Sequence, residues 1–201
     1  SQFCPSLFGM AEFRKKIVKR AAILTAEVLN GPVRRRNKKH LLIGYVHNEY
    51  PPIYTMLARH SGFNSAFLMR GTEGCVTPSL RKRSEFARYW EQSEDVVVEA
   101  DPSKIGIEQE NRPKPIPHAL MTIIDREFGP DENNAEISKL AEKEGLANIE
   151  GKKSATCDAL LYSASLTLWH LGRYDSVPDA ASMVRKILFS GKAAARFRRA
   201  E

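Results

Sequence analysis

Several features that assign a protein to a broad class are missing from this chain of 201 residues. It holds only three cysteines, Cys4, Cys75 and Cys157, which lie far apart and form no CxxC pair. An odd, scattered count of this kind argues against a disulfide framework and against a zinc site. We therefore expect free thiols in a reducing compartment.

Signals for a membrane or for export are also missing. No apolar run approaches the roughly 20 residues that a membrane span needs, and no basic-then-apolar leader with a small-residue cleavage site opens the chain. We expect a cytoplasmic protein with no membrane partner. The length fits one domain or a large part of one, and we treat residues 1–201 as a single domain. Because the first residue is Ser1, either the start was processed or the chain begins partway through a longer protein.

The common catalytic and phosphate-binding motifs are absent as well. Neither a GxGxxG nor a GxxxxGK loop occurs, and no Ser-His-Asp or Cys-His arrangement can be read from the sequence. Four histidines show no metal-ligand spacing to one another, so we expect ordinary surface or core residues at His40, His60, His118 and His170. On this basis we assign no catalytic residue and no metal ligand.

What the chain does have is an excess of positive charge, unevenly placed. Its formal net charge is +7 and its isoelectric point about 9.4, values that bear on partners rather than on fold. Ten Lys or Arg residues lie between Arg14 and Lys39 against one acid, and six lie between Arg185 and Glu201, also against one acid. The middle of the chain, residues 95–150, is acidic.

Two short basic segments carry the clearest functional signal. The first contains Arg34, Arg35, Arg36, Lys38 and Lys39, and the second contains Arg81, Lys82 and Arg83. If both loops lie at the same sheet edge, they form one patch that binds the phosphates of single- or double-stranded nucleic acid. A pocket for a phosphorylated substrate and a merely solvated charged loop are the alternatives. Tyr89 and Trp90 follow closely and either stack on bases or, as strand residues, belong to the core.

The order of apolar segments predicts an α/β fold. A continuous apolar run at 41–46, a helix opened by Pro51-Pro52 and a second strand at 65–70, apolar over 66–69, form a βαβ unit, which implies a parallel pair. The expected architecture is a mixed, largely parallel sheet flanked by helices. The other predicted segments are helices at 7–29, from 133 or 134 to 145, at 154–171 and at 178–190, strands at 84–90 and 95–100, and an irregular loop at 111–119.

Two polar side chains follow the first predicted strand. They are His47 and Tyr50. In an open α/β sheet ligands bind at the carboxyl ends of strands, so both residues are candidates for lining a crevice. The alternative for His47 is that it only caps the strand end.

Three stretches resemble the anthranilate phosphoribosyltransferase family, also called glycosyltransferase family 3. They are "GPVRRRNKKHLLIGYVHNEY", "GTEG" and "SATCDALLYSASLTLWHLGRYDSVPDAASMVRKILFSGKAAARF", in that order. The resemblance implies the fold shared with pyrimidine nucleoside phosphorylases and corresponds to roughly the C-terminal three-fifths of a family member. Members begin with a helical domain, through which they usually form homodimers, and carry a GTGGD-type loop for the pyrophosphate of phosphoribosyl pyrophosphate. This chain has no such loop.

The segment Gly71-Thr72-Glu73-Gly74 is similar to the start of a G-x-D-G-L-D-E loop in these enzymes. The final Asp-Glu pair of that loop holds magnesium on the substrate's pyrophosphate, because magnesium prefers hard oxygen ligands. Here the pair is replaced by Val76-Thr77. We expect Glu73 to accept backbone hydrogen bonds in the loop, and Gly71 and Gly74 to permit positive φ. The resemblance therefore implies no cofactor for this chain, and magnesium with phosphoribosyl pyrophosphate only if the full-length protein is active.

Three functions follow as hypotheses. The first is a family member without the standard magnesium-dependent activity that binds nucleic acid or phosphate-rich ligands through a basic face, as some members of a divergent branch do. The second is an active phosphoribosyltransferase that transfers phosphoribose to anthranilate or another nitrogenous acceptor. The third is a subunit whose role is protein interaction.

Overall fold

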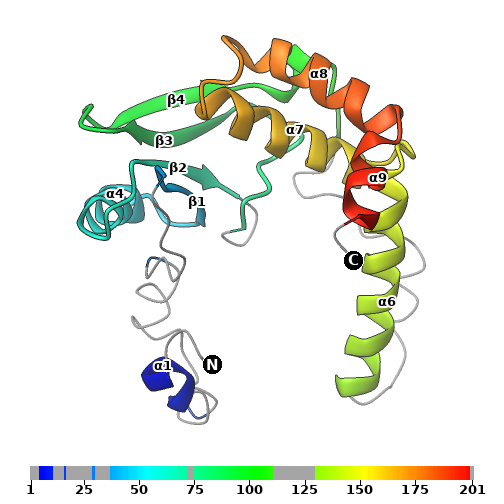
Figure 1. Cartoon of the computed structure of the whole chain (residues 1–201), viewed down its shortest axis with the longest axis horizontal. Helices are drawn as coiled ribbons and strands as arrows, with labels where there is room; N and C mark the ends of the chain where they lie inside the picture. Colours follow the sequence, from blue (N-terminus) through cyan, green and yellow to red (C-terminus); the bar gives the residue numbers. More distant parts are fainter. Residues whose placement is uncertain are drawn as a thin grey trace.

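The computed structural model describes residues 5–10, 16, 29, 37–71, 75–110 and 130–199, the side chains of residues 6, 7 and 130–134 excepted. Four strands and their connecting helices form one α/β arrangement (Figure 1). Several predictions lie outside the described residues: most of the helix at 7–29, the loop at 111–119, Glu73, Gly74 and Arg34 to Arg36. A short helix, α1, spans Pro5–Gly9.

The sheet contains β1 (His40–Tyr45), β2 (Ser65–Arg70), β3 (Ser84–Trp90) and β4 (Val96–Ala100), in that order. β1 and β2 are parallel, whereas β2–β3 and β3–β4 are antiparallel. The predicted α/β fold with a mixed sheet is confirmed, but only one of the three pairings between described strands is parallel, where a largely parallel sheet was expected. For β3 and β4 the reason lies in the connection, because residues 91–95 form a short turn, which can link only antiparallel strands.

One face of the sheet is covered by α4 (Tyr50–His60), which is the crossover of the predicted βαβ unit. Pro51 and Pro52 occupy its first turn, where a missing backbone N–H costs nothing. Its buried side chains, Tyr54, Thr55 and Ala58, lie against residues of β1, β2 and β3 that point to this side. This face is called the α4 face below.

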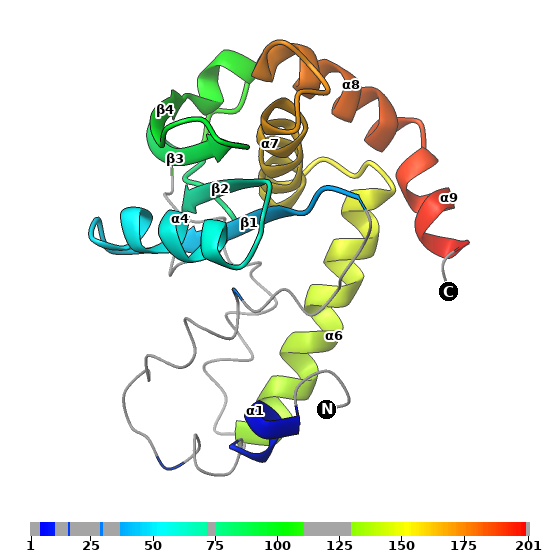
Figure 2. The same cartoon turned by 60° about the vertical axis from the view of Figure 1, so that its left-hand side comes forward.

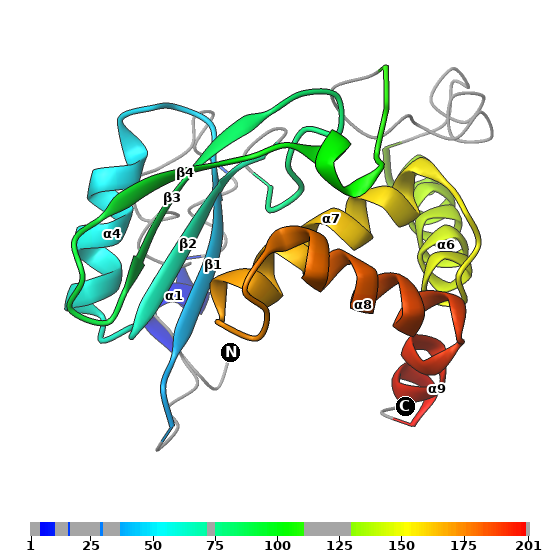
Figure 3. The ribbon, with the colours of Figure 1, turned by 90° about the horizontal axis from the view of Figure 1, so that it is seen from above.

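The other face is covered by α7 (Ala155–His170), and α8 (Val177–Phe189) packs beside it. Figures 2 and 3 show α4 and α7 on opposite sides of the sheet. β2 is therefore buried on both faces, and residues 66–69 are fully inaccessible to solvent. Both helices match their predicted bounds within one residue, because Ser154 and Ser176 cap their starts and glycines follow their ends.

The helix α6 (Pro130–Ile149) differs from its prediction. Gly145 was expected to end it, but the helix runs four residues further, and a methyl group at Gly145 would meet nothing within 4 Å. The left-handed residue that follows α6 is Gly151, with φ +86°. A short 3-10 helix, η2 (Pro102–Ile105), and a last helix, α9 (Lys192–Arg198), complete the described elements.

No helix among the described residues has the length and apolar character that crossing a membrane requires.

Candidate functional site

The carboxyl end of β2 lies in a row of residues that crosses all four strands. Tyr45 is the register partner of Arg70, and Glu85 is the partner of Glu99. Since Met69 pairs with Phe86, the next residues along these strands, Arg70 and Glu85, are also neighbours. Side chains alternate along a strand, so this row points to the α4 face.

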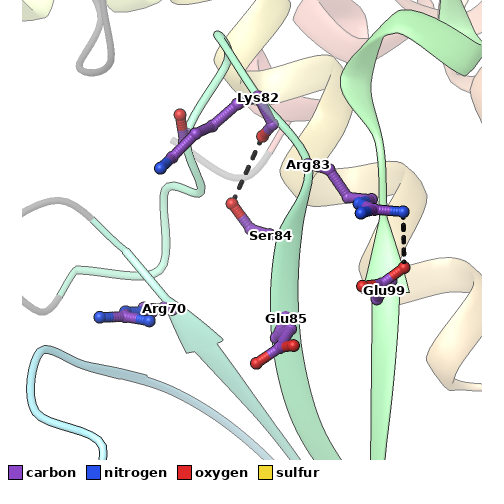
Figure 4. Close-up of a pocket in the computed structure, with 7 residues that line it drawn as sticks. Arg70, Lys82, Arg83, Ser84, Glu85 and Glu99 are labelled. Atoms are coloured by element: carbon purple, nitrogen blue, oxygen red, sulfur yellow. Dashed lines mark hydrogen bonds and ion pairs between the residues drawn. The ribbon is translucent and has the colours of Figure 1, made fainter.

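A polar pocket of about 430 Å³ lies over this row and is lined by Arg70, Ser79, Lys82, Arg83, Ser84, Glu85 and Glu99. Figure 4 shows Arg70, Glu85 and Glu99 following one another across three strands, with Lys82 above Arg70. The pocket thus combines three cations with two carboxylates at the edge of the sheet where open α/β folds bind ligands.

The charges of the pocket are only partly neutralised. Arg83 Nη1 lies 3.1 Å from Glu99 Oε2 and forms an ion pair with it. Among the described residues, neither Arg70 nor Lys82 forms an ion pair. Within the described lining of the pocket, two cationic side chains are therefore left for an anionic ligand, and Glu85 is the one unpaired carboxylate beside them.

Gly71 marks the point where β2 leaves the sheet. It forms an isolated bridge with Pro78, and a methyl group on it would overlap the Cys75 carbonyl oxygen and come within 2.6 Å of the carbonyl carbon. Its φ is not positive, so the expectation of a left-handed Gly71 is wrong. The glycine is required because the chain at Cys75 passes directly against its backbone.

The positions that align with the family's magnesium ligands do not fit a magnesium ion. Val76 offers no donor side chain, and its carbonyl oxygen accepts a hydrogen bond of 3.2 Å from Ser163 Oγ of α7. Thr77 donates its backbone N–H to Cys75 Sγ at 3.4 Å. Within the described part of the chain no group of three or more His, Cys, Asp or Glu residues could hold a metal ion. A carboxylate pair, which magnesium on a pyrophosphate needs, is missing from this loop.

The structure places the predicted crevice residues His47 and Tyr50 at the same edge of the sheet as Arg70, because Tyr45 ends β1 beside Arg70. His47 is exposed and Tyr50 half-buried. Their ring centroids lie 6.1 Å apart. Neither side chain lines the pocket itself, so they flank the site rather than form it.

The two basic segments do not form one patch among the described residues. Arg81 to Arg83 precede β3 and lie beside the carboxyl end of β2, since β2 and β3 are antiparallel. Lys38 and Lys39 precede β1 and lie at its opposite end.

Both lysines at that opposite end already have partners. Lys38 forms an ion pair with Glu91. Lys39 donates from Nζ to the Ser61 carbonyl oxygen at 3.0 Å and lies 5.0 Å from the centroid of the Phe63 ring. Both lysines are therefore already engaged by other residues at the amino end of the sheet.

A chain of polar side chains that was not predicted from the sequence runs at this amino end from exposed His40 to buried Ser65 and His170. Ser65 Oγ lies 2.7 Å from His40 Nδ1 and 2.9 Å from His170 Nε2. His170 is 3% exposed, and burial, together with the positive charge of Arg88, lowers its pKa to about 3. Trp90 stacks on His40 with centroids 5.2 Å apart. Of the two expectations for His170, a surface or a core residue, the structure shows the core residue.

Tyr89 is not available for stacking on bases. It is 1% exposed, its hydroxyl donates to the Phe63 carbonyl oxygen at 3.0 Å, and the Arg59 guanidinium lies 3.8 Å from its ring centroid. Of the two readings for this aromatic residue, the structure decides for the core. Burial also raises its pKa to about 12.

Of the residues that line the pocket, only Lys82 and Arg83 were predicted from the sequence as site residues. Arg70, Glu85 and Glu99 were not. One available signal was that Arg70 is the polar residue at the carboxyl end of an apolar predicted strand, where ligand-binding residues of α/β folds are found. The two glutamates come together only through the antiparallel register, which the sequence does not reveal.

Comparison with known proteins gives a result at the level of the fold. No family model matches this sequence, and no curated protein does. Anthranilate phosphoribosyltransferase from Thermus thermophilus superposes with a TM-score of 0.59 at 18% identity, over 97% of this chain and 51% of the enzyme. The Saccharomyces cerevisiae enzyme in complex with PRPP and Mg superposes with a TM-score of 0.59 at 17% identity, over 92% of this chain and 46% of the enzyme. A variant of that enzyme with Mg bound superposes with a TM-score of 0.60 at 19% identity, over 92% of this chain and 48% of the variant.

This chain has the fold of anthranilate phosphoribosyltransferase. The resemblance seen in the sequence is thereby confirmed at the level of the fold. Sequence identities of 17–19% show the fold alone and not the activity. The chain spans about half the length of the phosphoribosyltransferase structures that it matches.

Proposed function

We propose that the chain binds phosphate groups in the pocket at the carboxyl end of β2, through Arg70 and Lys82, without the magnesium-dependent transfer of the enzymes that share its fold. The observation that carries this proposal is a polar pocket, at the edge where open α/β sheets bind ligands, in which two cations have no ion-pair partner among the described residues. The ligand is a phosphate-rich molecule, either a single-stranded nucleic acid or a phosphorylated sugar. Both kinds of ligand carry the phosphate groups that the two cations would bind.

Arg70 and Lys82 suit this role in different ways. An arginine guanidinium can donate two parallel hydrogen bonds to a phosphate, whereas a lysine acts as a point charge with three donors. Arg81 is exposed directly before the pocket and extends the positive surface outward. Since Arg83 neutralises Glu99, Glu85 is the one unpaired carboxylate among the described residues that line the pocket.

The second candidate is an active phosphoribosyltransferase acting on anthranilate or another nitrogenous acceptor. It is supported by the fold shared with an enzyme whose structure holds PRPP and Mg. Val76 and Thr77 oppose it, because neither supplies the carboxylate that the metal would need. The remaining chemistry would have to come from residues outside the described part of the chain.

The test is a titration of a fluorescein-labelled single-stranded oligonucleotide, followed by anisotropy at about 50 and about 200 mM salt. With three phosphate contacts, at Arg70, Arg81 and Lys82, affinity should fall roughly twentyfold between these conditions. The double variant Arg70→Ala/Lys82→Ala should weaken binding at low salt by about tenfold or more, because each lost charge-assisted bond contributes on the order of 1 kcal/mol or more.

A matched control removes the same charge elsewhere. Lys139 and Lys143 are exposed on α6, and the variant Lys139→Ala/Lys143→Ala should keep the affinity within about twofold. A second arm measures phosphoribosyl pyrophosphate by calorimetry, with and without magnesium. Binding that requires magnesium favours the transferase. If neither ligand binds, or if the two double variants lose affinity equally, the proposed function is wrong.

A further inference from the structure

A second cavity, of about 530 Å³, lies where η2, α7 and α8 meet. Figure 3 shows α7 and α8 side by side. The glycine that ends η2, the start of α7 and the last turn of α8 contribute to its lining. It shares no described lining residue with the pocket of Arg70 and Lys82, and its volume is that of a small-molecule site. It is called the α7–α8 cavity below.

Three charged side chains of both signs line this cavity without pairing. They are Lys153, which precedes α7, Asp158 of α7 and Arg185 of α8. Among the described residues none of the three forms an ion pair. The cavity thus holds two cations and one carboxylate that lie too far apart to neutralise one another.

Two of these charges are half-buried and held in place by neighbours. Gln109 Nε2 donates a hydrogen bond of 2.8 Å to Asp158 Oδ2. Arg185 Nη2 donates to the Ile105 carbonyl oxygen. Each group keeps further capacity, because a carboxylate accepts several hydrogen bonds and a guanidinium has other N–H groups. Groups that are held in advance lose little freedom when a ligand binds.

The rest of the cavity includes an apolar wall. Cys157, Leu161 and Leu188 line it, and each is only 4% exposed. Phe189 also lines the cavity but is 47% exposed, so its ring is accessible to a ligand. A wall of this kind favours a ligand with an apolar body, and an aromatic ring can pack against the phenylalanine.

The combination of charges and apolar wall selects among ligand classes. An apolar ligand without charge would leave the charged groups desolvated and unpaired, which is unfavourable. A simple acid would satisfy Lys153 and Arg185 but would bring its negative charge near Asp158, and a simple amine would do the reverse. A molecule with a carboxylate, an ammonium group and an apolar side chain satisfies all three charges and the wall.

We propose that the α7–α8 cavity binds an apolar α-amino acid. Its carboxylate pairs with Lys153 and Arg185, its ammonium group pairs with Asp158, and its side chain packs against the apolar wall. The site is separate from the pocket of Arg70 and Lys82 and does not rest on the proposed function.

The probe is L-phenylalanine, titrated into the full chain by calorimetry. A ligand of about twelve non-hydrogen atoms should bind with a Kd of about 1 mM or tighter. Two analogues each lack one charge. Hydrocinnamate lacks the ammonium group and phenethylamine lacks the carboxylate, and each should bind about tenfold more weakly than phenylalanine because one charge-assisted contact is lost.

The variant Asp158→Asn separates the two charges of the ligand. It keeps an oxygen for the Gln109 amide but loses the negative charge. Phenylalanine should therefore bind about tenfold more weakly to this variant, whereas hydrocinnamate should bind at least as tightly as to the original chain. A variant that had merely lost its structure would weaken both ligands.

Adjacent lysines give a matched pair of charge reversals. Lys153 and Lys152 are both exposed, but Lys152 does not line the cavity. Lys153→Glu should weaken phenylalanine binding about tenfold, and Lys152→Glu should leave it within about twofold. The double variant Arg70→Ala/Lys82→Ala should bind phenylalanine as the original chain does, which distinguishes this site from the proposed phosphate pocket.

Three results would overturn the proposal. They are no saturable binding of phenylalanine up to about 10 mM, equal losses of phenylalanine affinity in Lys152→Glu and Lys153→Glu, and equal weakening of phenylalanine and hydrocinnamate by Asp158→Asn.

Discussion

At the level of single residues, Gly71 is where an added methyl group should be most harmful. Gly71→Ala would place a carbon 2.6 Å from the Cys75 carbonyl carbon and 3.1 Å from the Thr77 carbonyl oxygen, so the chain at 75–77 must move. Overpacking of this kind costs about 1–3 kcal/mol of unfolding free energy, measurable by urea denaturation. The control is Gly145→Ala in α6, where the added carbon meets nothing within 4 Å. It should stabilise the protein by about 0.5–1 kcal/mol. Equal effects at both glycines would contradict the close approach seen at Gly71.

His170 makes the stability of the protein depend on pH. Burial lowers its pKa from 6.5 in the unfolded chain to about 3 in the folded one. The unfolded chain therefore binds more protons below pH 6.5, so the contribution of His170 is complete above that pH and is lost as the pH falls toward 3. The unfolding free energy should decrease by up to about 1.4 kcal/mol per pH unit in this window.

Denaturation with urea between pH 7.5 and 5 measures this slope. His170→Gln removes the titrating group and should flatten the slope, even if it also lowers stability at pH 7.5. His60→Gln on α4, an exposed position, should retain the slope of the original chain. The explanation fails if His170→Gln leaves the pH dependence unchanged.

At the scale of elements, the start of α7 depends on one serine. Ser154 Oγ accepts a hydrogen bond from the Cys157 N–H at 3.1 Å and donates one to Asn148 Oδ1 at 2.7 Å. Asn148 is 2% exposed and its Nδ2 has no partner among the described residues, so Ser154→Ala leaves a buried amide with no remaining hydrogen bond. We expect the unfolding free energy to fall by about 2 kcal/mol, because the variant loses both the helix cap and the hydrogen bond to the Asn148 side chain.

The matched comparison is Ser176→Ala at the start of α8. Ser176 accepts from the Asp179 N–H at 3.2 Å, and its hydroxyl pairs with the exposed Asp179 carboxylate, which water can satisfy instead. Its loss should cost about 1 kcal/mol, the value of a cap alone. Thermal or urea unfolding of the two variants measures the difference, and equal losses would rule out a structural role for Asn148.

Elements with strong local signals were predictable from the sequence. β1, α4 and β2 follow from two continuous apolar runs around a Pro-Pro helix start, and α7 and α8 from serine caps and terminal glycines. The end of α6 was not predictable, because an exposed glycine inside a helix looks like a stop. Only two residues of the pocket, Lys82 and Arg83, were predicted from the sequence. Arg70, Glu85 and Glu99 come from three strands, and only the antiparallel register brings them together.

At the scale of the whole molecule, the sheet separates two sets of cations. Lys38 and Lys39 lie at the amino end of β1, and Arg70 and Lys82 at the carboxyl end of β2. Six residues of strand span roughly 20 Å, more than twice the screening length of about 8 Å at physiological salt. Charge reversal at Lys38 should therefore leave ligand binding in the pocket within about twofold.

The variant Lys38→Glu tests this separation in the oligonucleotide titration. Its unfolding free energy should fall by less than about 1 kcal/mol, the usual contribution of an exposed ion pair such as the one with Glu91. A drop in affinity as large as that of Arg70→Ala/Lys82→Ala would instead show that the ligand extends along the sheet to its amino end.

The burial of β2 on both faces has a consequence for the way the chain is made. Phe67 of β2 packs against Trp169 and His170, about a hundred residues later in the sequence. During synthesis, residues 66–69 leave the ribosome long before α7 exists to cover them, and an apolar strand left open in this way is prone to pair with other chains. The early product is thus a natural client for chaperones. A shortened chain that stops before α7 should collect in inclusion bodies rather than yield a smaller folded unit.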